Sequence, residues 1–130
     1  MRPRKLLVTG GAGFIGSNFT RYMLSKYKNL EITVLDKLTY AGNPENLKEL
    51  EGDTRYKFIH GDICDDKVAE GAARGVDCIV NFAAETHVDR SIGDPASFIK
   101  TDIYGTYVLL EVTRKLGIPK FVQISTDEVY

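Results

Sequence analysis

Short apolar runs alternate with longer amphipathic stretches along the whole chain. Five of these runs have the features of buried strands, because each is short, contains β-branched or aromatic residues and is bounded by polar or turn-forming residues. The expected strands cover 5–10 (KLLVTG), 31–36 (EITVLD), 56–62 (YKFIHGD), 77–84 (DCIVNFAA) and 120–126 (KFVQIST).

Helical signals occupy the four intervals between the expected strands. Apolar residues at helical spacing mark the first and the last interval. In the second, Asn43 is the expected N-cap before Pro44. In the third, Asp65 and Asp66 suit the first turn and Gly75 the end. The first expected helix begins at 14. The other three cover 43–50, 65–75 and about 95–116.

The strict alternation of strands and helices predicts an α/β fold with a Rossmann-like, doubly wound parallel sheet and right-handed crossovers. We expect about five strands in the order 3-2-1-4-5. By analogy with the six-stranded order 3-2-1-4-5-6, this sheet would be truncated after strand 5. A length of 130 residues suits a single domain with a real core.

Charge and composition exclude several classes of partner. Lys and Arg number 17 against 18 Asp and Glu, and no basic stretch suggests a nucleic-acid or membrane-surface site. The apolar run of the N-terminus, 6–8, is too short for a signal peptide or a membrane span. Cys64 and Cys78 lack metal-ligand spacing, and we expect thiols in a reducing compartment, no metal and a cytoplasmic protein.

A glycine motif, TGGAGFIG, lies directly between the first strand and the first helix. Gly10 would permit a tight turn, Gly13 the close approach of a pyrophosphate, and Gly16 the packing of the helix. Asp36 closes the next strand 20 residues after Gly16, where an acid binds an adenosine ribose. These residues predict a dinucleotide site that favours NAD over NADP, a preference that Lys37 weakens slightly; the alternative is a set of turn glycines without a ligand.

The spacing G-x-x-G-x-x-G and the GD pair 61–62 resemble the extended short-chain dehydrogenase/reductase family. The segments TGGAGFIG, DKLTYAGN, GDI, FAAETHVDRS and STDEVY, in that order, resemble the N-terminal part of the dTDP-glucose 4,6-dehydratase family over all 130 residues. The resemblance implies an NAD-binding domain over 1–130, without the family's C-terminal substrate domain. The cofactor-binding residues expected besides Gly10, Gly13, Gly16, Asp36 and Lys37 are Phe14, Ile15, Asp62, Ile63, Phe82, Ala83 and Ala84.

The family's reaction oxidises the glucose C4 hydroxyl with NAD, eliminates water across C5 and C6, and returns the hydride to C6. By resemblance Thr126 hydrogen-bonds the C4 hydroxyl, Asp127 is the acid and Glu128 is the base. Two close carboxylates in a poorly solvated cleft separate their pKa values, which would leave one proton donor and one acceptor. The alternative is a solvated acidic turn.

The loop after the fourth strand, ETHVDRS, would face the ligand crevice at the carboxyl ends of the strands. We expect Glu85, His87 and Arg90 to contact a nucleotide-sugar substrate. The alternatives are a structural histidine and an ion pair between Arg90 and Asp89.

Members of this family also carry a Tyr-x-x-x-Lys pair on the helix after the fifth strand. In this sequence only Tyr22 and Lys26 have that spacing, and they belong to the first helix. We therefore expect the 130-residue chain to be inactive alone. Two alternatives remain: a half-Rossmann fragment that self-associates without cofactor, as a possible homodimer, and a fragment of a related sugar-nucleotide epimerase or decarboxylase.

Overall fold

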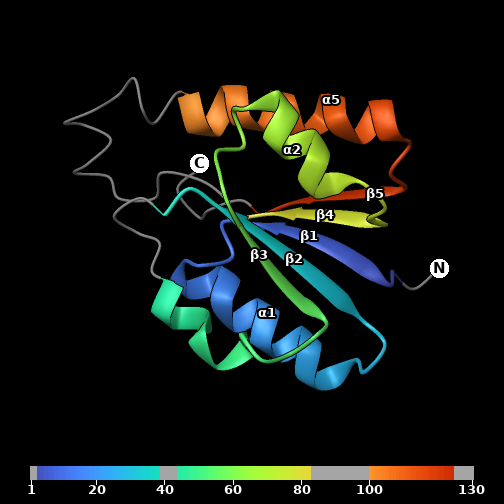
Figure 1. Ribbon diagram of the computed structural model, residues 1–130. Helices are drawn as coiled ribbons and strands as arrows, with labels where there is room; N and C mark the ends of the chain where they lie inside the picture. Colours follow the sequence, from blue (N-terminus) through green and yellow to red (C-terminus); the bar gives the residue numbers. More distant parts are fainter. Residues whose placement is uncertain (1–2, 39–43, 83–99, 125–130) are drawn as a thin grey trace.

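The computed structural model describes residues 3–38, 44–82 and 100–124. Five parallel strands form one sheet in the order β3-β2-β1-β4-β5 (Figure 1). The predicted Rossmann-like topology is therefore confirmed. The strands are β1 (Lys5–Thr9), β2 (Glu31–Asp36), β3 (Tyr56–His60), β4 (Cys78–Asn81) and β5 (Lys120–Gln123).

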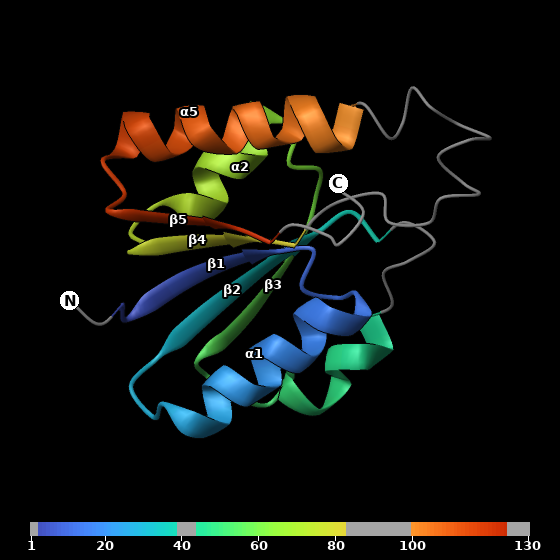
Figure 2. The same ribbon diagram turned by 180° about the vertical axis from the view of Figure 1, so that it is seen from behind.

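Helices cover both faces of the sheet, as Figure 2 shows from behind. One face carries α1 (Phe14–Lys26) and the 3₁₀ helix η1 (Pro44–Leu50). The other carries α2 (Asp66–Ala73) and α5 (Thr106–Leu116), which continues the π-helical segment η2 (Lys100–Gly105). Alternate residues of each strand therefore serve two separate hydrophobic layers.

The apolar residues of β1 illustrate this division. Leu7 packs with α2 and α5 in one cluster, which includes Leu109 and Val112. Leu6 and Val8 point to the opposite face and pack with the cluster that α1 and η1 cover. All three β1 side chains are at most 3% exposed. Both faces of this strand are therefore shielded from solvent. This explains why its sequence is a continuous apolar run rather than an alternating one.

Two helices have well-defined ends, and the first of them follows the predicted signal at Asp65. Asp65 caps α2 through its side chain, which accepts hydrogen bonds from the N–H groups of Lys67 and Val68. Gly117 ends α5 in the left-handed conformation, with φ 66°. The predicted second helix is 3₁₀ rather than α-helical, and its expected cap, Asn43, lies outside the described residues.

The fourth strand is shorter than the sequence predicted. It ends at Asn81 because its ladder with β1 ends at the pair Thr9 and Asn81, where Gly10 turns the chain away. The N–H of Phe82 still donates to the carbonyl of Thr9 at 2.9 Å, but Phe82 is no longer in the strand. The fifth strand likewise ends at Gln123, and the last residues predicted for it, from 125, lie outside the described part.

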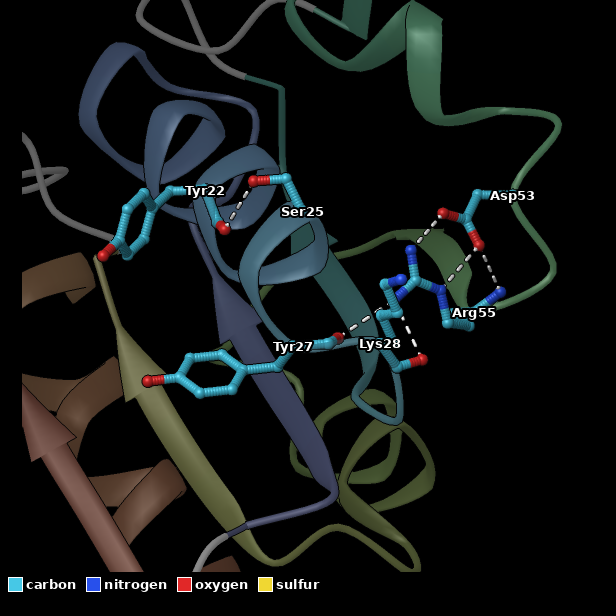
Figure 3. Close-up of polar contacts among 6 residues, drawn as sticks. All are labelled: Tyr22, Ser25, Tyr27, Lys28, Asp53 and Arg55. Carbon is cyan, nitrogen blue, oxygen red and sulfur yellow. Dashed lines mark hydrogen bonds and ion pairs between the residues drawn. The ribbon is translucent and has the colours of Figure 1, made fainter.

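Arg55 joins two loops near the amino ends of the strands (Figure 3). Its Nη1 donates to the carbonyls of Tyr27 and Lys28 at 3.0 and 3.2 Å. Its Nη2 lies 2.9 Å from Oδ2 of Asp53. The guanidinium therefore fixes the loop before β2 against the loop before β3.

Candidate functional site

The glycine turn lies at the carboxyl end of β1 and leads directly into α1. Gly10 has φ 71°, a left-handed conformation that glycine adopts without steric cost. Its N–H donates to the carbonyl of Leu35 on β2 at 2.9 Å, and its carbonyl accepts from the N–H of Gly13 at 3.2 Å. Gly13 is the N-cap of α1, with no side chain to cover the first turn. The backbone N–H groups at the start of α1 therefore face the end of the sheet where ligands of this fold bind.

Two glycines permit close packing around this turn. A Cβ at Gly16 would overlap the carbonyl oxygen of Gly10 and lie 2.9 Å from Cα of Gly11. A Cβ at Gly11 would lie 2.6 Å from Cγ1 of Val34 on β2. The glycine motif predicted the role of Gly16 but not that of Gly11, for which the consecutive glycines of TGG were the available signal.

Asp36 reaches back from the end of β2 to the glycine turn. Its Oδ2 accepts a hydrogen bond from the N–H of Ala12 at 2.8 Å, and its Oδ1 accepts from the N–H of Leu38 at 2.8 Å. The residue is 8% exposed. Each oxygen of an ionised carboxylate has about two lone-pair sites, so both retain capacity for a further donor, such as a hydroxyl. Leu38 has φ 59°, unusual for a branched side chain and found here beside the candidate site.

Lys37 and Asp62 form an ion pair beside Asp36. Nζ of Lys37 lies 3.4 Å from Oδ2 of Asp62, at the ends of the neighbouring strands β2 and β3. Burial would raise the pKa of the Asp62 carboxyl, but the N–H of Cys64 and the ammonium of Lys37 outweigh it and lower that pKa. Asp62 is therefore an anion at neutral pH.

The apolar residues predicted to bind the cofactor fall into two groups. Phe14 and Ile15, in the first turn of α1, are 79% and 64% exposed. Ile63 is only 4% exposed, and its side chain packs in the core where Gly105 approaches. Phe82 is half-buried and stacks against Phe19 of α1, with ring centroids 5.3 Å apart.

A buried polar chain that the sequence analysis missed joins the carboxyl ends of β1, β4 and β5. The hydroxyl of Thr9 donates to Oδ1 of Asn81, and Nδ2 of Asn81 donates to Oε1 of Gln123 at 2.8 Å. Thr9 and Asn81 are fully buried. The available signal was a polar residue at the end of each otherwise apolar strand. Buried polar groups are costly unless they are paired. These hydrogen bonds therefore hold the carboxyl ends of β1, β4 and β5 together next to the glycine turn.

Eight predicted site residues lie outside the described residues: Ala83, Ala84, Glu85, His87, Arg90, Thr126, Asp127 and Glu128. Within residues 3–38, 44–82 and 100–124, no group of three or more His, Cys, Asp or Glu side chains could hold a metal ion. In the same part of the chain, no helix is long and apolar enough to cross a bilayer. Cys64 and Cys78 are free thiols, as predicted.

Comparison with known proteins places this arrangement among enzymes of sugar nucleotides. The family model described as GDP-mannose 4,6 dehydratase matches residues 7–130. A dTDP-glucose 4,6-dehydratase of Streptomyces niveus is 52% identical over 130 residues, covering 97% of this chain and 39% of the relative. The chain spans about 40% of the length of the curated relatives that it matches.

Solved structures give the same result. The dTDP-glucose 4,6-dehydratase DesIV from Streptomyces venezuelae, solved with NAD bound, superposes with a TM-score of 0.92 at 51% identity, covering 97% of this chain and 40% of that chain. A UDP-Glc/GlcNAc 4-epimerase from Campylobacter jejuni has a TM-score of 0.85 at 32% identity, covering 95% and 37%. The resemblance to the dehydratases that the motifs indicated is therefore confirmed.

Proposed function

Since the chain belongs to the GDP-mannose 4,6-dehydratase family, we propose that it is the NAD-binding part of a nucleotide-sugar dehydratase similar to dTDP-glucose 4,6-dehydratase. One observation carries the NAD assignment. The carboxylate of Asp36 is held beside the glycine turn by the N–H of Ala12, with acceptor capacity left on both oxygens. A ribose with two free hydroxyls suits that carboxylate, whereas a 2′-phosphate would be repelled.

The residues of the glycine turn fit a dinucleotide. Gly10 and Gly13 leave the start of α1 without side chains over its backbone, so a pyrophosphate can reach the N–H groups of Phe14 and Ile15. The side chains of those two residues are exposed. Asp62 and the backbone of Ile63, after β3, would flank the adenine, and Phe82 with Ala83 and Ala84 would line the path of the nicotinamide half. When bound, NAD would supply the acceptor for the hydride of the sugar C4 position.

The chemistry at the sugar is assigned to the segment after β5. Glu128 would take the C5 proton, Asp127 would give a proton to the departing C6 hydroxyl, and Thr126 would hydrogen-bond the C4 hydroxyl. One ionised and one protonated carboxyl are needed at the same pH, which two neighbouring acids achieve by separating their pKa values. Glu85, His87 and Arg90 would contact the nucleotide sugar.

We further propose that the 130-residue chain binds NAD without turning over a sugar nucleotide. The one Tyr-x-x-x-Lys pair of the sequence is Tyr22 and Lys26, whose Oη and Nζ lie 3.1 Å apart. Both residues are exposed in the last turns of α1, at the end of that helix remote from the glycine turn. They cannot remove a proton from a substrate at the carboxyl edge of the sheet.

Calorimetric titration of the purified chain with NAD tests this proposal. We expect saturable binding of one NAD per chain, weaker binding of NADP, and no product when dTDP-glucose is added with NAD. A folded chain that binds no NAD would contradict the cofactor assignment. Turnover of dTDP-glucose by the chain alone would contradict the proposed inactivity.

An exposed apolar face on η2 and α5 favours self-association as a second role. Ile103, Tyr104, Tyr107 and Leu110 are between 48% and 67% exposed. Residues 108, 109 and 112 of α5 are buried against the sheet, so the exposed group lies on the outer face of the helix. A contiguous apolar surface of this kind typically marks a protein interface. We propose a homodimer through this face. Binding of NAD neither requires this homodimer nor excludes it.

The remaining alternative is a related epimerase or decarboxylase. The dehydratase structures are more similar in sequence, at 44% to 51% identity against 32% for the Campylobacter epimerase. The adjacent acids Asp127 and Glu128 also suit an elimination better than an epimerisation, in which no water leaves. We assign the cytoplasm as the compartment, where Cys64 and Cys78 remain reduced.

A further inference from the structure

Lys37 lies where a cation could reverse the cofactor preference. It follows Asp36 directly, and a basic side chain near this acid is what accommodates a 2′-phosphate on the adenosine ribose. Its ammonium instead lies 3.4 Å from Oδ2 of Asp62. Its carbonyl lies 3.0 Å from Nε2 of His60, at the end of β3. Both the main chain and the side chain of Lys37 are therefore tied toward β3.

The carboxylate of Asp62 is itself held in place. Its Oδ1 accepts a hydrogen bond from the N–H of Cys64 at 2.9 Å, which leaves Oδ2 for Lys37. The side chain of Asp62 is 28% exposed, against 50% for that of Lys37. The acid is the more fixed partner, and the flexible ammonium comes to it.

We propose that Asp62 is a specificity-determining residue, which binds the ammonium of Lys37 and so prevents it from binding a 2′-phosphate. This inference rests on the proposed NAD site. With the ammonium of Lys37 bound to Asp62, the negative charge of Asp36 faces the ribose, and NAD is preferred. Without Asp62, the same ammonium, on four methylenes, is free to reach toward the ribose edge.

The variant Asp62→Asn tests the inference. An asparagine keeps an acceptor for the N–H of Cys64 but removes the charge that holds Lys37. We expect the ratio of the Kd for NADP to the Kd for NAD to fall by about two- to fivefold, the size expected for a partly exposed ion pair. The double variant Lys37→Met/Asp62→Asn is the matched control, and there the ratio should not fall.

Other outcomes separate this inference from the proposed function. Equal weakening of NAD and NADP by Asp62→Asn would overturn the inference, because Asp62 would then act only on the shared adenine. A wild-type chain that binds neither dinucleotide would contradict the proposed function itself. NMR titration tests the ion pair independently. The pKa of the Asp62 carboxyl should be higher in Lys37→Met than in the wild type. An unchanged pKa would overturn the inference.

Discussion

Glycine has opposite consequences at two helical positions in this protein. A Cβ at Gly16, in α1, would overlap the backbone of the glycine turn. A Cβ at Gly71, in α2, would have no atom within 4 Å. Gly16 is required because the backbone of Gly10 and Gly11 leaves no room for a side chain there. Gly71 only increases the conformational entropy that folding must overcome.

Gly16→Ala and Gly71→Ala should therefore change stability in opposite directions. We expect Gly16→Ala to lower the free energy of unfolding by about 1–3 kcal/mol, because the backbone must move to admit the methyl group. We expect Gly71→Ala to raise it by about 0.5–1 kcal/mol, as for a glycine within a helix. Urea denaturation of both variants measures this, and equal effects would contradict the packing assigned to Gly16.

Tyr56, at the start of β3, makes stability sensitive to alkaline pH. Burial, helped by the charge of Glu51, raises the pKa of its hydroxyl from 10.0 to about 12. Because the folded pKa lies above the unfolded one, the folded state binds the proton more tightly. Its contribution to stability is fully present below pH 10 and is lost as pH rises toward about 12.

Tyr56→Phe should remove this part of the alkaline destabilisation. The free energy of unfolding, measured by urea denaturation between about pH 9 and pH 11, should fall less steeply in the variant than in the wild type. A wild-type slope in Tyr56→Phe would show that other groups cause the loss.

At the scale of elements, one guanidinium connects loops that are distant in sequence. Arg55 holds the carbonyls of the loop that follows α1, and Asp53 holds Arg55 (Figure 3). The hydrogen bonds from Arg55 lower the pKa of the Asp53 carboxyl below its ordinary value of 3.8. A carboxyl with a depressed folded pKa stabilises the fold above its unfolded pKa, and this contribution is lost as pH falls through the folded pKa.

Asp53→Asn should therefore destabilise the protein at neutral pH and have little effect in strong acid. The measurement is the difference in free energy of unfolding between wild type and variant, followed from about pH 7 down to pH 2. The difference should shrink as pH falls below 3.8. Asp66→Asn, at an acid in the first turn of α2, provides a comparison at a residue outside this contact. A difference that is independent of pH would contradict the ion-pair account.

At the scale of the whole molecule, one outer surface of the sheet carries exposed apolar residues of η2 and α5. On one side, α5 carries its apolar residues on both faces, one packed on the sheet and one exposed. The rings of Tyr104 and Tyr107 lie 6.1 Å apart on the exposed face. An exposed surface of this kind is stabilised when a second copy covers it, because apolar area is then removed from water.

Tyr107→Glu should shift the protein toward the monomer if this face forms the proposed dimer. Burying a carboxylate at the centre of an apolar interface is unfavourable, so the dimer dissociation constant should rise at least about tenfold. Sedimentation equilibrium measures it. Tyr22→Glu makes the same change at an exposed tyrosine of α1 and should leave the dissociation constant as it is. Equal effects of the two variants would exclude this face.

The strand order was predicted by analogy with the doubly wound fold, whereas the strands themselves, the glycine turn and the acid at the end of β2 were predicted from the sequence. These depend on local patterns: apolar runs need two covered faces, and a turn with φ 71° needs glycine at Gly10. The early end of β4, the contact of Gly11 with Val34, and the chain from Thr9 through Asn81 to Gln123 were decided by tertiary structure. Each joins residues on different strands, and the spacing of residues within one segment carries no information about which side chains meet across a sheet. The pairing of Lys37 with Asp62 belongs to the same class, because two parallel strands bring together residues 25 positions apart.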